Sequence, residues 1–343
     1  MQLYNKLSSN EREKILEASN LERITLSFYK YASIKNPSKL RDDLFIFWNS
    51  IDVLGRTYIA NEGINAQLSL PKKNLNIFSN HLMKIYFLKD LRINVALQHN
   101  LKSFLKLKVK VKNKIVADGL NDNFFDVTKK GEHLNAKEFN NHMKDKNSIV
   151  LDMRNHYESE IGHFREAICP DVDTFRDSLS IIERDILKNK KNKKLLMYCT
   201  GGIRCEKASA YFKHKGFQNV YQLEGGIIEY AKQVKEQGLE NNFIGKNFVF
   251  DGRMAEEVSK QVIANCHQCG TPFDIHTNCA NDGCHLLFIQ CNDCKEIMEN
   301  CCSYECRETF RKPLDKQKLL RKGKKTKHDI FKKGRTIKVS RID

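Results

Sequence analysis

Long hydrophobic runs are missing from this sequence. No stretch of eighteen or more apolar residues occurs in the 343 residues, so we expect no transmembrane helix and no contact with membranes. The first residues, MQLYNKLSSNEREKILEAS, mix acidic and basic side chains and lack the apolar core of a signal peptide. We therefore expect a cytoplasmic protein.

A disulfide framework is also not expected, although the chain contains twelve cysteines. Thiols stay reduced in a protein without an export signal. The cysteines therefore indicate thiolate chemistry or metal binding. The length suits two or three domains, and we find no internal repeat.

Positive charge is abundant and unevenly distributed. The net charge is +17, and residues 311–343 contain fourteen Lys or Arg against three Asp, so this basic tail carries +11 of it. A block of like charges repels itself and is suited to binding a polyanion. We favour nucleic acid as the partner; the alternative is a solvated tail that only maintains solubility.

Residues 1–120 contain alternating strand-like and helix-like patterns. The order is βαββαβ, with a strand at 24–32, a helix at 39–51, two strands within 55–71, a helix at 74–87 and a strand at 92–97. This order predicts a ferredoxin-like α+β domain. Residues 104–112 alternate strictly and predict an extra strand with lysines on its outer face.

Aromatic residues in this first domain lack the arrangement of the common RNA-recognition module. We expect Phe28, Tyr29 and Tyr31 to pack within the domain rather than to stack on bases. The function of the domain stays open at this point.

Residues 125–238 predict an α/β domain with a parallel sheet, because strand and helix patterns alternate there. Strands are expected at 148–154 and 193–199 and after 219, and helices at 178–189 and after Arg204. Cys199 then lies at the carboxyl end of a strand, where open α/β sheets bind their ligands.

Cys199 begins a loop with the spacing C-x-x-x-x-R. The five residues that follow it are Thr200, Gly201, Gly202, Ile203 and Arg204. Such a loop, closing onto a helix start, directs backbone N–H groups toward one point and forms an anion-binding site. The helix end, the amides and Arg204 would lower the pKa of the Cys199 thiol and make it nucleophilic. The loop alone leaves open the alternative of a buried structural cysteine.

The flanking residues resemble the rhodanese family. DMRNHYESEIGHFREA (152–167), CTGGIR (199–204) and LEGGIIEY (223–230) match three elements of that family in order. The resemblance implies a persulfide-carrying cysteine at Cys199 and an anion-binding role for Arg204. It also implies that Asp152, Arg154 and Glu158 hold the sheet and the loop in place. We expect Cys205 to be a packing residue; the alternative is a resolving partner for oxidised Cys199.

Taken over nearly its whole length, the chain resembles the bacterial tRNA uridine hydroxylases. The resemblance rests on SFYKY, NEGINAQ, GHF, CTGGIRCEKASA, GKNFVFD and CHQCG. It implies an enzyme that converts the wobble uridine (position 34) of tRNA to 5-hydroxyuridine, with molecular oxygen as co-substrate and no role for DNA. The electron donor is not named by the sequence. The alternatives are a sulfurtransferase that passes sulfur from a Cys199 persulfide to RNA or a carrier, and a non-catalytic RNA-binding adaptor.

Residues 239–310 are rich in cysteine and poor in regular patterns. CHQC and CNDC lie 25 residues apart, a spacing typical of paired tetrahedral zinc ligands. Since the segment has little apolar mass, an ion could supply stability. We expect structural zinc on Cys266, Cys269, Cys291 and Cys294, with Cys279, Cys284, Cys302 and Cys306 as a second candidate set. The alternatives are interleaved pairs and a set of reduced thiols that bind no metal. His267, His276 and His285 are not expected to be ligands.

Overall fold

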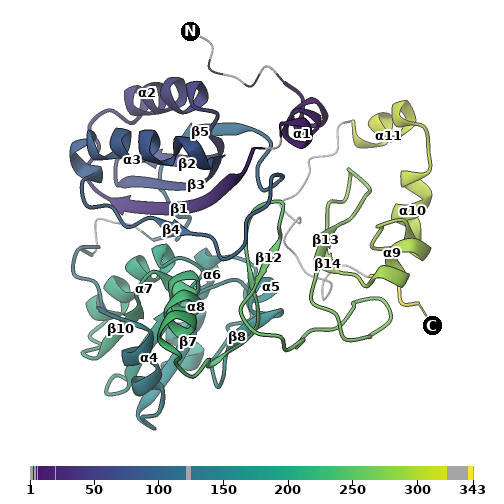
Figure 1. The fold of residues 1–343 in the computed structure, drawn as a ribbon. Helices are drawn as coiled ribbons and strands as arrows, with labels where there is room; N and C mark the ends of the chain where they lie inside the picture. Colours follow the sequence, from purple (N-terminus) through teal and green to yellow (C-terminus); the bar gives the residue numbers. More distant parts are fainter. Residues whose placement is uncertain are drawn as a thin grey trace.

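The computed structural model describes residues 3, 5, 7–19, 21–120, 125–322 and 339–342. Figure 1 shows an N-terminal sheet with helices, a central parallel sheet and a C-terminal region of short elements. Every helix in the described part is too short or too polar to span a lipid bilayer. Most of the basic tail, residues 323–338, lies outside the described residues.

Five strands form the N-terminal sheet, in the order β4-β1-β3-β2-β5. The strands are β1 (Arg23–Tyr31), β2 (Leu54–Ala60), β3 (Gly63–Pro71), β4 (Asn94–Val95) and β5 (Leu107–Val111). The pairs β4–β1, β1–β3 and β3–β2 are antiparallel, and the pair β2–β5 is parallel. The predicted ferredoxin-like arrangement with an extra strand is confirmed.

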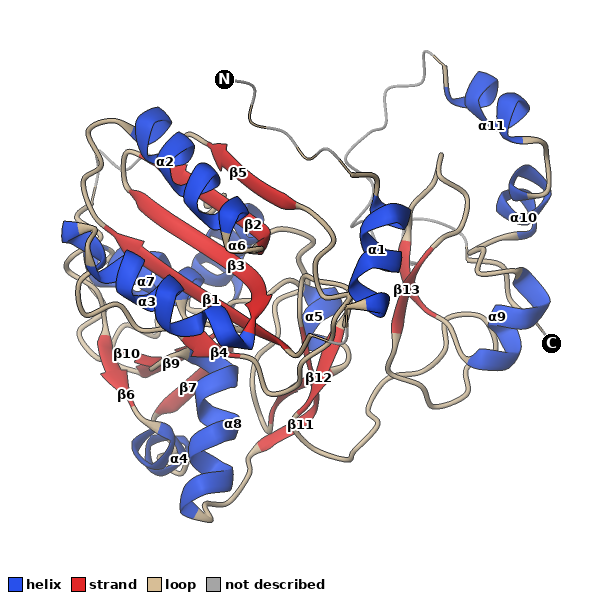
Figure 2. Cartoon of the chain, turned by 45° about the horizontal axis from the view of Figure 1, so that its top comes forward, coloured by secondary structure: helices blue, strands red, loops and turns tan. Residues whose placement is uncertain are grey.

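Helices cover one face of this sheet (Figure 2). They are α2 (Pro37–Ser50) and α3 (Leu75–Met83), and α1 (Ser9–Ala18) lies apart from them, toward the C-terminal region. The helix predicted at 74–87 is divided into the short turn η1 (Lys72–Asn74), α3 and the turn η2 (Tyr86–Leu88). The β-branched and aromatic residues after Met83 have low helix propensity, which accounts for the earlier end.

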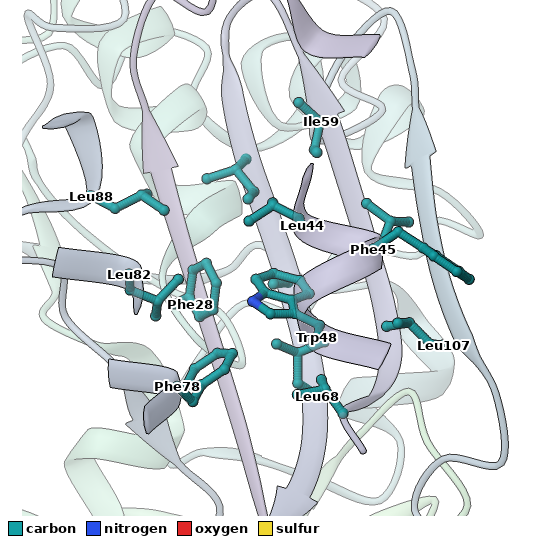
Figure 3. Close-up of a cluster of buried hydrophobic side chains, with 14 of the residues drawn as sticks. Phe28, Leu44, Phe45, Trp48, Ile59, Leu68, Phe78, Leu82, Leu88 and Leu107 are labelled. Carbon is teal, nitrogen blue, oxygen red and sulfur yellow. The ribbon is translucent and has the colours of Figure 1, made fainter. Parts of the chain in front are cut away.

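The first hydrophobic core lies between this sheet and its helices (Figure 3). Trp48 is fully buried, with ring centroids 6.4 Å from Phe28 and 5.6 Å from Phe78. Phe28 therefore packs as predicted. Since neighbouring side chains of a strand point to opposite faces, the residues on either side of Phe28 face away from the helices, toward the central domain.

The central domain has a parallel sheet, as the sequence predicts. Its strand order is β6-β10-β9-β7. Its strands are β6 (Glu132–Leu134), β7 (Ser148–Asp152), β9 (Lys194–Tyr198) and β10 (Val220–Leu223). Its helices are α4 (Ala136–Met143), α5 (His156–Ser159), α6 (Phe175–Ile181), α7 (Ile203–His214) and α8 (Gly226–Gln237). The second half of the helix expected at 178–189 is instead a π-helical turn, η3 (Ile182–Ile186).

The segment after residue 239 contains more regular structure than its sequence suggested. β11 (Phe243–Phe248) pairs with β8 (Gly162–Phe164) of the central region on one side and with β12 (Ala255–Glu257) on the other. β13 (His276–Asn278) and β14 (Leu287–Ile289) form an antiparallel pair. The helices α9 (Asn292–Met298), α10 (Tyr304–Phe310) and α11 (Leu314–Arg321) follow.

Lys207 of α7 joins the central domain to the first domain. Its ammonium nitrogen lies 2.6 Å from a Glu62 carboxylate oxygen and 3.0 Å from an Asp118 oxygen, and its side chain is completely buried. The same ammonium lies 5.7 Å from the centre of the Tyr31 ring. A buried charge needs such partners, because desolvation without them is costly. The relative position of the two domains therefore depends on this cluster.

We expect Lys207→Met to lower the free energy of unfolding by about 3–5 kcal/mol, because it leaves two carboxylates without their buried cation. Urea denaturation would measure the loss. The matched control is Lys213→Met, an exposed lysine on the same helix, for which we expect a change within about 0.5 kcal/mol. Equal effects of the two changes would contradict the structural role of Lys207.

Candidate active site

Cys199 directly follows strand β9 and faces the turn that leads into α7. The backbone N–H of Gly202 donates to the Cys199 sulfur at 3.1 Å. Gly202 has φ +100°, a left-handed conformation that favours glycine. A side chain there would also meet the Tyr29 hydroxyl at 2.7 Å. The glycine is thus needed both for the turn and for the approach of the first domain.

The start of α8 supports the other side of the loop. The N–H of Ile227 donates to the Cys199 carbonyl at 3.0 Å, and the N–H of Ile228 donates to the Thr200 carbonyl at 3.3 Å. A Cβ added to Gly226, which has φ +67°, would lie 2.5 Å from the Cys199 carbonyl oxygen. Gly225 and Gly226, the N-cap and the first residue of α8, therefore let the helix end bind the loop backbone directly.

The Cys199 thiol is acidic although it is buried. Burial raises its pKa, but the Cys205 thiol, the Arg204 guanidinium and the backbone N–H groups of Arg204 and Cys205 outweigh burial and lower the pKa to about 6. Burial and the hydrogen bond to Cys199 raise the pKa of Cys205 well above its ordinary value. At neutral pH Cys199 is therefore a thiolate, and buried Cys205 is a thiol that contacts it.

Arg204 is held by Glu158 in a bidentate ion pair. The two nitrogen–oxygen distances are 2.6 and 2.8 Å, and the Glu158 side chain is fully buried. The same Nη2 that contacts Glu158 also donates to the Thr200 hydroxyl at 3.4 Å. Arg204 stabilises the Cys199 thiolate through its positive charge and through its backbone N–H.

Asp152 and Arg154 form a second buried pair behind the first. The Arg154 guanidinium donates to Asp152 at 2.6 Å and to the Gly162 carbonyl at 2.6 Å. It also donates to the Glu158 carbonyl at 3.4 Å. Arg154 thereby fixes the end of β7, the short helix α5 and the start of β8 relative to one another, as well as the backbone of the residue that holds Arg204.

A cavity of about 490 Å³ opens beside Cys199. Its walls include the helix-free face of the N-terminal sheet, the cysteine loop, residues around α5 and the start of α6, and residues between β11 and β12. The lining includes Ser27, Tyr29, Tyr58, Asn65, Gln67, Thr200, Arg204, Phe250 and Arg253. The first domain therefore supplies a wall of the site, a role that the sequence left open.

Tyr29 illustrates what the sequence analysis missed. We expected a packing residue, whereas its ring lines the cavity and its hydroxyl donates to Glu206 at 3.1 Å. The available signal was the alternation in ITLSFYKY, which leaves a polar or tyrosine side chain at every second position. That pattern marks a sheet face covered by something other than a hydrophobic core.

The cysteines of the C-terminal region gather in two groups. The structure brings together the four members of each set considered from the sequence: Cys266, Cys269, Cys291 and Cys294, and Cys279, Cys284, Cys302 and Cys306. Within each group all sulfurs lie within 4.8 Å of one another. Cys301 is buried but belongs to neither group.

The two groups fit a metal that prefers thiolates in tetrahedral geometry. Sulfur–sulfur distances are 3.6 Å for Cys269–Cys291 and 3.7 Å for Cys284–Cys302. A tetrahedron with Zn–S bonds of about 2.3 Å requires about 3.8 Å. Beside the first group, the His267 ring lies 3.0 Å from Glu160 and outside the set of sulfurs.

We expect alkylation of Cys199 by iodoacetamide to follow a pKa near 6, since the reagent reacts with the thiolate. The rate should rise about tenfold per pH unit below pH 6 and level off above it. Arg204→Met should shift the profile to higher pH, because the nearest positive charge is lost. Peptide mass spectrometry assigns the modified residue. A Cys199 profile centred near pH 9 would contradict the stabilised thiolate.

Three family models match successive parts of the chain. The family model "UPF0176 acylphosphatase like domain" matches residues 23–115, "Rhodanese-like domain" matches 135–233, and "Rhodanase C-terminal" matches 244–307. The rhodanese match contains Cys199 and its loop. Both cysteine groups lie within the third match, because their residues run from Cys266 to Cys306.

Relatives of known name match almost the full length. The tRNA uridine(34) hydroxylase of Leptospira interrogans serogroup Icterohaemorrhagiae serovar Lai is 54% identical over 333 residues, which is 97% of this chain and 90% of that protein. Those of Photorhabdus laumondii and Enterobacter sp. (strain 638) are 50% and 49% identical over 334 residues, 97% of this chain and 95% of theirs. This chain belongs to the tRNA uridine(34) hydroxylase family.

Proposed function

We propose that this enzyme hydroxylates carbon 5 of uridine 34 in tRNA, with molecular oxygen as co-substrate and Cys199 as the reactive residue. The observation that carries the proposal is a thiolate with a pKa of about 6 in a cavity of about 490 Å³. The chain that forms this cavity is 54% and 50% identical in sequence to two proteins named tRNA uridine(34) hydroxylase. Loop residues 200–204 bind and orient the thiolate, and Asp152, Arg154 and Glu158 are positioning residues.

A nucleophilic thiolate suits this chemistry. Addition of the Cys199 sulfur to carbon 6 of the uracil makes carbon 5 electron-rich, so that it can accept an oxygen atom. Loss of the carbon 5 proton and of the thiolate then restores the double bond. The second oxygen atom of O₂ leaves as water and takes up two electrons and two protons. The reaction therefore needs an external electron donor, which living cells supply.

The partner macromolecule is then tRNA, as the basic composition of the chain favours. The basic tail, residues 311–343, is expected to contribute phosphate contacts that weaken with salt. A tRNA substrate also agrees with the cytoplasmic location that we expect from the sequence. DNA has no place in this reaction.

We expect expression of the chain in a bacterial strain that lacks uridine 34 hydroxylation to add one oxygen atom to that uridine, detected by mass spectrometry of tRNA nucleosides. Cys199→Ser should abolish the product, because a serine hydroxyl stays protonated near neutral pH. Cys205→Ser should keep most activity, since its hydroxyl can still donate to the thiolate.

The matched control is Cys169→Ser. Cys169 is half-buried in the same domain, lies outside the cavity lining, and has a pKa raised to about 12 by burial and by Asp152. Product formation by Cys199→Ser at the wild-type level would remove the cysteine from the mechanism. Replacement of a nucleoside oxygen by sulfur would instead support the sulfurtransferase, which the rhodanese loop also suits.

Both cysteine groups are proposed to hold structural zinc. Four thiolates at tetrahedral spacing are a typical structural site for this ion, which supplies folding free energy to segments with small cores. Among the described residues, the buried members of the hydrophobic cluster around the second group are Leu286, Phe288 and three cysteines, with Ala280 and Val339 packed against them. The small size of this cluster favours a metal-stabilised segment.

We expect elemental analysis of protein purified without added metal to find two zinc ions per chain. Cys291→Ser should remove one ion and Cys302→Ser the other, with a lower melting temperature in each case. Cys301→Ser is the control, because this neighbour of Cys302 lies outside both groups and should leave two ions bound. A chain that is folded and active without metal would contradict a structural role.

A further inference from the structure

A second cavity adjoins the one beside Cys199. It has a volume of about 440 Å³ and lies between the first domain and the C-terminal region. The two cavities share Phe104, Phe250 and Asp251 as lining residues, so they are neighbours. The second cavity contains no cysteine and no residue of the anion-binding loop in its lining. A molecule bound at Cys199 could therefore continue into it.

One row of paired residues on the N-terminal sheet leads from the first cavity to the second. Ser27 pairs with Gln67, Gln67 with Arg56, and Arg56 with Lys108. Residues paired across strands lie on the same face of a sheet. Ser27 and Gln67 line the cavity beside Cys199, whereas Arg56 and Lys108 line the second. With strands about 4.8 Å apart, the row spans roughly 14 Å.

The positive charge at the second cavity is not neutralised within the protein. Among the described residues, no ion pair forms with Arg56, Lys106 or Lys108. Lys102, another lysine of the lining, forms ion pairs with two glutamates of α1 at 2.7 Å each. Asp251, the acidic residue of the lining, is bound by Arg253. The cavity therefore has an uncompensated positive wall.

Aromatic rings also line this cavity. Phe248 and Phe250 line it, with ring centroids 5.1 Å apart. The Arg56 guanidinium lies 5.9 Å from the centre of the Phe104 ring, which holds it on the cavity side of the sheet. Basic side chains that follow a backbone, together with rings on which bases pack, are the usual components of a single-stranded nucleic acid site.

We propose that the second cavity binds the nucleotide next to the target uridine in the tRNA anticodon loop. Its phosphate contacts Arg56, Lys106 and Lys108, and its base packs beside Phe250. This assignment rests on the proposed function, because the neighbouring cavity must hold the uridine. The sheet row from Lys108 to Ser27 then guides the RNA strand toward Cys199.

The test compares two double variants with equal loss of charge, each with the tail intact. Arg56→Gln/Lys108→Gln changes the second cavity, and Lys137→Gln/Lys144→Gln changes exposed lysines in and directly after α4, which line neither cavity. Binding of a fluorescent anticodon stem–loop RNA with uridine at position 34 is measured over a range of salt concentrations. We expect the cavity variant to raise Kd about tenfold and to reduce the salt slope by about 1.4, as for two lost phosphate contacts.

The control variant should bind like the wild type. Equal binding by the cavity variant and the wild type, or equal weakening in both double variants, would overturn the proposal. Hydroxylation of full tRNA is assayed separately, and there the cavity variant should show a higher KM with a nearly unchanged kcat. Failure of the wild type to hydroxylate tRNA would contradict the proposed function, while the binding comparison would still decide the RNA site.

Discussion

Keeping a sulfur anion stable inside the protein is the constraint on which the rest of the site depends. Burial alone would raise the pKa of Cys199, so its neighbours must supply compensating dipoles and charge. The Gly202 N–H and the Arg204 charge do so. A buried guanidinium needs its own carboxylate, which is Glu158, and the backbone of Glu158 is fixed in turn by Arg154 and Asp152. One thiolate thus accounts for two buried ion pairs and two glycine turns.

The cavity places a further demand on the fold, since no single part of the chain surrounds Cys199. The first domain contributes a sheet face without a hydrophobic cover, held against α7 by Lys207 and Tyr29. The C-terminal region is tied to the same wall, where the Gly252 N–H donates to the Ser103 carbonyl at 2.9 Å. Its two cysteine groups lie among small apolar clusters.

Local patterns allowed the sequence to predict the N-terminal sheet, the parallel sheet and the position of Cys199 at a strand end. The alternation in ITLSFYKY and the glycine pair after Thr200 are signals contained within a few residues. The pairing of β8 with β11 was not predictable, because the three residues of β8 are too few to show a period and β11 lies about 80 residues further along the chain. The ion pair of Glu158 with Arg204 spans 46 residues and has no local pattern. The cavity is lined by many segments that are far apart in the sequence, so it could be recognised only after folding.

The residues that lower the Cys199 pKa and those that face a substrate lie in different parts of the chain, and this separation has an evolutionary consequence. The groups that make Cys199 acidic all belong to the central domain, whereas much of the wall that meets a substrate belongs to the N-terminal sheet and the segment near Phe250. Substitutions in Ser27, Gln67 or Tyr58 can therefore alter which molecule fits without disturbing the nucleophile. A domain with such a loop can acquire a new substrate by gaining a neighbouring domain, while the loop itself stays unchanged.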